Sequence, residues 1–164
     1  MGATYGLNDG RTYNTIALAD IRHYLRLGQY SALANRLFAF SSSGAEPQRL
    51  YLGGSWSFRG YDRKAFYNRH ILFASNELRF PLIDNLLIGS PIGALDFRGI
   101  RGALFFDTGA AWDDTFTQFY GSFGTGFRVN VAYLVVLRFD FSHTTDFHTV
   151  DPHTDFDFFF GWNF

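Results

Sequence analysis

The ten residues DFDFFFGWNF at positions 155–164 decide the fold class of this chain. Successive side chains of an extended strand point to opposite faces, so alternate positions share one face. Here one face carries only aromatic side chains, and the other is mostly acidic, small or polar. Hydrocarbon is a natural cover for the aromatic face, and a tilted strand of about 10 residues spans a bilayer. The segment therefore predicts a transmembrane β-strand whose outward residues are Phe156, Phe158, Phe160, Trp162 and Phe164.

The same two-residue period recurs in four earlier segments, at 71–80, 100–113, 119–130 and 133–144. In each segment the charged side chains share one face, as expected if a basic side chain facing lipid at mid-depth costs about 2–4 kcal/mol. Three less regular segments bring the expected number of strands to eight. They are 3–7, 12–26 and 30–42, with a hairpin turn at Asn8-Asp9-Gly10 and with Asp20, Arg22 and Arg36 as inward candidates.

The connections alternate in length, which is typical of outer-membrane barrels. Long loops are expected at 43–69, 113–118 and 145–154, short turns near 27–29 and 130–132, and one long connection on the short-turn side at 81–98. We expect a transmembrane antiparallel β-barrel of about eight strands that closes on itself. Half of a sixteen-stranded dimer, a fragment of a larger barrel, and a soluble β-sandwich or lipocalin-like barrel remain alternatives.

The composition excludes several classes of protein. A chain of 164 residues fits a single domain, 1–164. A net charge of −1 gives no electrostatic reason to bind nucleic acid. The absence of cysteine excludes disulfides and thiolate metal sites. Lys64 is the only lysine, so the polar strand faces, rich in Gly, Ser, Asp and Arg, resemble a packed interior more than a solvated exterior.

Several motifs follow one another in an order that is found in one family. They are Gly53-Gly54 and Arg59-Gly60-Tyr61 in the long loop, Asn76-Glu77-Leu78-Arg79, Phe105-Phe106-Asp107-Thr108-Gly109, Gly124-Thr125-Gly126-Phe127-Arg128 and the terminal Phe164. Over about residues 12–164 the chain resembles the C-terminal half of the BamA/TamA-type outer-membrane assembly factors, also called the bacterial surface antigen family. It departs from them in having about eight strands of sixteen, no periplasmic POTRA modules and no first strand of the lateral gate.

The resemblance implies a site inside the barrel. In the family the loop arginine enters the barrel and pairs with carboxylates on the inner wall, which here implies Arg59 with Asp107 and Glu77. The strand alternation independently puts both carboxylates on the inward face. A guanidinium binds a carboxylate through two parallel hydrogen bonds, which lysine cannot reproduce. Gly60, beside the arginine, permits close approach of the backbone or a positive φ.

The first functional hypothesis is an integral outer-membrane β-barrel of a Gram-negative bacterium, related to assembly and translocation factors. Its role would be membrane-perturbing, lipid-interacting or structural, without catalytic residues, cofactor or metal. The expected partners are outer-membrane lipids and, if the barrel is shared, a second copy of the chain. We expect the terminal aromatic residues to act as the membrane-insertion signal, namely Phe158, Phe160, Trp162 and Phe164.

The alternative hypothesis is a small outer-membrane hydrolase or acyltransferase that uses the extracellular loop 142–153. This loop contains three histidines and two aspartates, His143, His148, His153, Asp146 and Asp151. Their spacing is not diagnostic of a metal site, and Pro152 indicates an irregular loop. Three inward carboxylates could form acid/base pairs, but neighbouring inward arginines favour a structural ion network. The carboxylates are Asp140, Asp155 and Asp157, and the arginines are Arg128 and Arg138.

Overall fold

The computed structural model describes residues 2–5, 12–90, 93–131 and 135–162. These residues form an all-β structure in which every strand pairing is antiparallel. No helix in the described part of the chain is long and apolar enough to cross a membrane. The expected turn at Asn8-Asp9-Gly10 and the terminal Phe164 lie outside the described residues.

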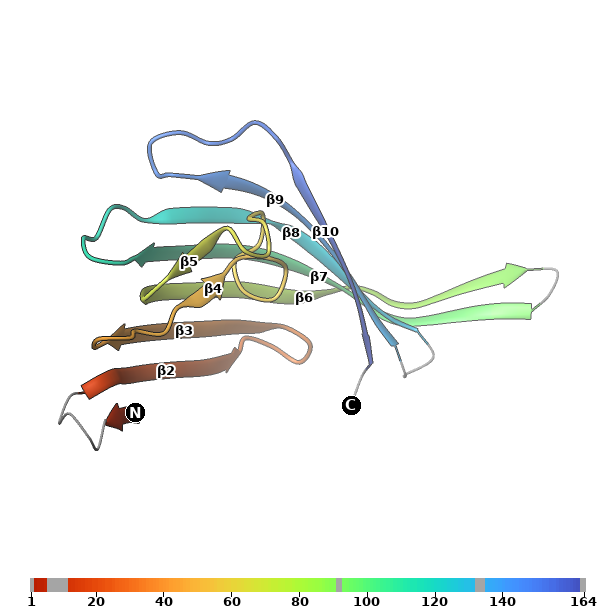
Figure 1. Cartoon of the computed structure of the whole chain (residues 1–164). Coiled ribbons are helices and arrows are strands. Elements are labelled where there is room, and N and C mark those ends of the chain that lie inside the picture. Colours follow the sequence, from red (N-terminus) through yellow and green to blue (C-terminus); the bar gives the residue numbers. More distant parts are fainter. Residues whose placement is uncertain (1, 6–11, 91–92, 132–134, 163–164) are drawn as a thin grey trace.

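Eight strands form one sheet in the order β1-β2-β3-β6-β7-β8-β9-β10 (Figure 1). A second sheet of two short strands, β4 and β5, lies within the long loop between β3 and β6. The bounds are β1 Gly2–Tyr5, β2 Thr12–Arg26, β3 Ala32–Ser43, β4 Leu50–Leu52, β5 Phe66–Asn68, β6 His70–Ser90, β7 Gly93–Trp112, β8 Tyr120–Val131, β9 Val135–Thr145 and β10 Asp155–Trp162.

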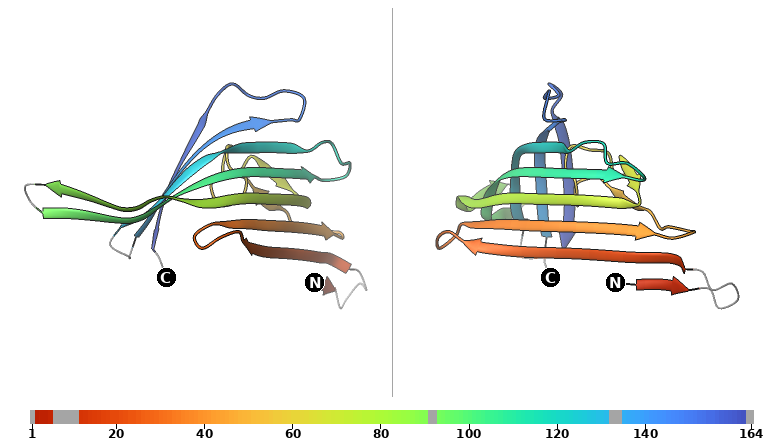
Figure 2. Two further views of the ribbon diagram at one scale, coloured as in Figure 1. Left: turned by 180° about the vertical axis from the view of Figure 1, so that it is seen from behind. Right: turned by 90° about the vertical axis from the view of Figure 1, so that its left-hand side faces the viewer.

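The sheet is curved but open, so the expectation that it closes on itself is wrong for this structure. β1 and β10 are its two edges, and no pairing joins them within the described residues. Figure 2 shows the resulting trough from two further directions. The difference in length between the two edge strands explains why they do not pair. β1 has four residues and β10 has eight, so β1 can satisfy only part of the backbone of β10.

A long hairpin replaces the expected connection 81–98. β6 and β7 continue through this segment as paired strands, from Ile83 opposite Ile100 to Ser90 opposite Gly93. The register shifts between Pro81 and Ile83, which suits a residue that lacks a backbone N–H and is tolerated at bulges. The hairpin projects beyond the neighbouring strands on the short-turn side of the sheet (Figure 1).

The two faces of the sheet differ in chemistry, as the alternation predicts. One row of directly paired residues crosses six strands on the concave face and is almost entirely polar, running through Arg22, Arg36, Ser75, Asp107, Ser122 and Thr144. Residues in the alternating positions cover the convex face and expose large apolar side chains, among them Leu37, Leu72, Leu104, Phe106, Phe123, Phe127, Phe141, Phe156, Phe158 and Phe160.

The hydrophobic core lies on the concave side, between the sheet and the long loop. Phe58 from the loop is fully buried, and it packs beside Leu52 and Phe73. Gly109 makes room for it, because a Cβ atom at that position would stand 3.0 Å from Phe58 Cε1. The concave face of the sheet is therefore covered by the loop, whereas the apolar convex face is left uncovered. A soluble β-sandwich or small barrel has the opposite arrangement, with the apolar face inward.

Candidate functional site

The loop between β4 and β5 is a compact turn built on two glycines. Gly53 and Gly54 have φ values of 136° and 83°, a region that L side chains rarely adopt. The Ser57 hydroxyl donates to the Gly53 carbonyl at 2.7 Å, and the Gly54 N–H donates to the Tyr61 carbonyl at 2.8 Å. These bonds close the loop on itself, so that the residues between them project as a unit toward the sheet.

Arg59 projects from this loop onto the concave wall, where its side chain is buried. Its Nε and Nη2 donate to the two carboxylate oxygens of Asp107, both at 2.7 Å. Nη1 donates to Glu77 at 2.7 Å, and Nη2 also reaches the Ser75 hydroxyl at 3.1 Å. The guanidinium carbon lies 3.6 Å from the centre of the Phe105 ring. One guanidinium thus joins the loop to β6 and β7 through a bidentate ion pair, a second carboxylate and an aromatic face.

The neighbours of Arg59 in sequence fix its approach. Gly60 has a φ of 79°. A Cβ atom there would lie 2.9 Å from both Ser142 Oγ and Thr144 Cγ2, so only glycine allows the loop to come this close to β9. The Tyr61 hydroxyl lies 3.0 Å from the Gly121 carbonyl, and burial raises the pKa of Tyr61 to about 12. The Tyr61 hydroxyl therefore stays protonated, and its hydrogen bond ties the loop to β8.

Glu77 connects the loop arginine to a wider ion network. Besides Arg59, it accepts from Arg79 Nε at 2.6 Å and forms an ion pair with Arg128. Further along the wall, Arg138 pairs with the buried Asp140. Each buried carboxylate is therefore matched by at least one guanidinium, which a buried charge requires. This pairing favours a structural role for these groups over acid/base catalysis.

The other inward carboxylates have separate partners. Asp157 accepts from the Ser55 hydroxyl at 2.8 Å, and Asp155 lies 4.0 Å from His153 Nε2. Among the described residues of the terminal strand, Phe156, Phe158 and Phe160 lie on the expected outward face. The side chains of Phe156 and Phe158 are 56% and 53% exposed.

The histidines of the loop 142–153 do not come together as a site. His143 Nδ1 lies 3.1 Å from the Asp151 carbonyl, and its Nε2 lies 3.1 Å from Thr154 Oγ1. Asp146 accepts from the backbone N–H groups of His148 and Thr149, and these bonds lower its pKa. Within the described residues no group of three His, Asp or Glu side chains is arranged to hold a metal ion. These contacts shape a turn and do not orient the side chains toward a common point.

We call Arg59 and the residues that its guanidinium contacts the arginine site. Sequence reasoning missed two members of this site, Ser75 and Phe105. Both occupy the inward face that the alternation gives to Glu77 and Asp107, so the sequence contained a signal that they face the loop. It is weak, because serine and phenylalanine recur throughout the chain and only the register shows which of them face the loop.

Comparison with protein families places this geometry in a known context. A family model described as the Omp85 superfamily domain matches residues 37–164, from within β3 to the C-terminus. The chain belongs to the Omp85 superfamily. The expected family relationship is thereby confirmed at the level of the superfamily, whose members are outer-membrane proteins in bacteria. Comparisons with curated proteins and with solved structures give no significant match. The superfamily match contains every residue of the arginine site.

Replacing Arg59 with alanine in the Omp85-superfamily chain should lower the free energy of unfolding by about 3–5 kcal/mol, since it leaves the buried carboxylate of Asp107 without a guanidinium partner. Urea titration in detergent measures this change. A cycle with Asp107→Asn should give a coupling energy of about 1–3 kcal/mol. The control is Arg49→Ala, which breaks a surface pair with Asp113 and should cost about 1 kcal/mol or less. Additive effects of the two site mutations would contradict the pairing.

Proposed function

We propose that this chain is an integral β-barrel protein related to assembly and translocation factors, in the outer membrane of a Gram-negative bacterium. Its role there is to hold an extracellular loop inside the barrel and to act on the surrounding lipid. The observation that carries the proposal is the buried Arg59, which fixes a loop of the Omp85 superfamily to the inner wall of a sheet with an apolar outer face.

The convex face supports the placement in lipid. Its exposed side chains are large and apolar on six neighbouring strands, β2, β3 and β6 to β9, and Phe156, Phe158 and Phe160 continue this cover to the last strand, β10. Continuous apolar patches of this extent are rare on soluble monomers. Hydrocarbon would cover them without any further protein, while the ion pairs stay on the concave side. The terminal aromatic row would then serve as the membrane-insertion signal.

The open edges support a shared barrel. A bilayer does not satisfy unpaired backbone groups, so an open sheet edge is not stable in hydrocarbon. β1 and β10 are both edges in this structure, and a second copy of the chain could supply strands to both. We therefore propose a homodimer in which two troughs face each other and enclose one lumen.

The site itself supports a non-catalytic role. Arg59 and its two carboxylates form bonds to one another that leave little capacity for a reacting group. A fixed loop and a sheet with unpaired edges instead suit a protein that perturbs lipid or templates strands. Nothing in the loop 142–153 favours the hydrolase or acyltransferase alternative.

Placing a charge on the convex face tests the lipid contact. We expect Phe158→Arg to reduce the free energy of folding into lipid vesicles by about 2–4 kcal/mol, because the guanidinium would face hydrocarbon. The control Phe158→Leu keeps the position apolar and should insert almost as well as the original chain. Flotation of vesicles with bound protein measures the inserted fraction. Equal insertion of both variants would contradict the placement of this strand in lipid.

The mass of the detergent-extracted protein tests the shared barrel. Light scattering, with the detergent contribution subtracted, should give about twice the chain mass of 18.7 kDa. A protein that runs at the mass of one chain would contradict the homodimer and would require strands from another polypeptide segment. A species that is monodisperse in buffer without detergent would contradict the membrane placement itself.

A further inference from the structure

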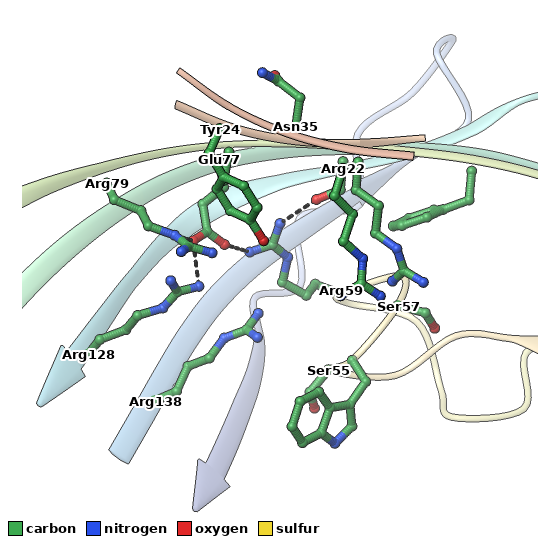
Figure 3. A pocket seen from close by; sticks show the side chains of 15 residues that line it. Arg22, Tyr24, Asn35, Ser55, Ser57, Arg59, Glu77, Arg79, Arg128 and Arg138 are labelled. Carbon is green, nitrogen blue, oxygen red and sulfur yellow. Dashed lines mark hydrogen bonds and ion pairs between the residues drawn. The ribbon is translucent and has the colours of Figure 1, made fainter. Parts of the chain in front are cut away.

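Six arginines converge on one cavity of about 190 Å³ on the concave face. Figure 3 labels the arginines that reach inward from β2, the loop, β6, β8 and β9. Glu77 is the one acidic residue among the described residues that line it. The six are Arg22, Arg36, Arg59, Arg79, Arg128 and Arg138.

The carboxylates around this cavity do not balance its charge. Four of them form ion pairs with the six arginines, and they are Asp20, Glu77, Asp107 and Asp140. Six guanidiniums and four carboxylates leave two positive charges, and Asp157, which accepts from the lining residue Ser55, lowers this excess to one. Asp107 and Asp140 are 0% and 1% exposed, so other side chains cover both carboxylates and the surface that meets solvent is mainly cationic. Like charges gathered in a hollow attract a counter-ion.

The arginines at the rim of this cavity also keep free donors. A guanidinium has five N–H groups. Within the described residues, Arg22 uses its Nε and one terminal nitrogen on Asp20, and Arg79 uses its Nε on Glu77. Their side chains are 56% and 35% exposed. The remaining N–H groups are therefore available to an acceptor that enters from solvent.

We propose that this arginine cavity binds a phosphate-type oxyanion. A phosphate monoester is an anion with three acceptor oxygens for the free N–H groups of Arg22 and Arg79, whereas one carboxylate offers only two acceptor oxygens. Paired N–H groups of arginine fit such oxygens in a bidentate manner. The site takes either free phosphate or the headgroup of a phosphate-bearing lipid. It involves β2, β6, β8 and β9 and does not depend on how the sheet edges are completed.

Calorimetric titration of the full chain with inorganic phosphate, in a maltoside detergent at low salt, tests this site. We expect saturable binding. In the double variant Arg22→Gln/Arg79→Gln the dissociation constant should rise about tenfold or more, since two charge-assisted contacts are lost. These positions spare the fold, because Asp20 keeps Arg36 and Glu77 keeps Arg59 and Arg128.

The matched control is Arg49→Gln/Arg63→Gln, which removes the same charge from residues of the long loop outside the cavity. Its dissociation constant should change by about twofold or less, because neither side chain lines the cavity and no contact with phosphate is lost. Tighter binding of dihexanoyl phosphatidic acid would identify a lipid headgroup, and equal or weaker binding would identify free phosphate. The proposal is overturned if phosphate does not bind or if both double variants bind it equally.

Discussion

The rest of the structure depends on one buried cation. Arg59 brings a positive charge to a wall with almost no contact with water, and this is favourable only because every part of the guanidinium has a partner there. Asp107 accepts two hydrogen bonds, Glu77 accepts one, and the Phe105 ring covers the face. Removing one partner would leave a desolvated charge, which costs far more than the pair gains. The loop is therefore held in a single docked position and cannot slide along the wall.

This requirement explains the distribution of residues over the sheet. An interior that must hold ion pairs has to be polar on its concave face, and it needs small residues where the loop comes close. Gly109 leaves room for Phe58, and Gly60 lets the loop approach Ser142. The apolar residues that a soluble protein would turn inward are left on the convex face, where Leu104, Phe127 and Phe158 are exposed. Loop docking and the proposed contact with lipid follow from one alternation of side chains.

Much of this could be predicted from the sequence, because side-chain alternation is a local property. It gave the strands at 71–80 and 100–113 and the inward faces of Glu77 and Asp107. The pairing of Arg59 came from the family resemblance, since no local pattern links a loop residue to a strand 48 positions away. The hairpin at 81–98 was missed because Pro81 and several glycines indicate a loop, whereas pairing between β6 and β7 overrides them. Closure was predicted wrongly, and the arginine cavity was not foreseen, because both depend on register between distant strands.

The hydrogen exchange of arginine side chains tests the central claim most directly. In nitrogen-15 NMR of the detergent-solubilised chain, the Arg59 Nε–H should exchange with water far more slowly than that of Arg49, because it is buried and bonded to Asp107. The conservative variant Arg59→Lys identifies the signal by its loss. A protected Nε–H that disappears in this variant is the predicted result. An Arg59 signal that exchanges as fast as that of Arg49 would contradict the docking of the loop.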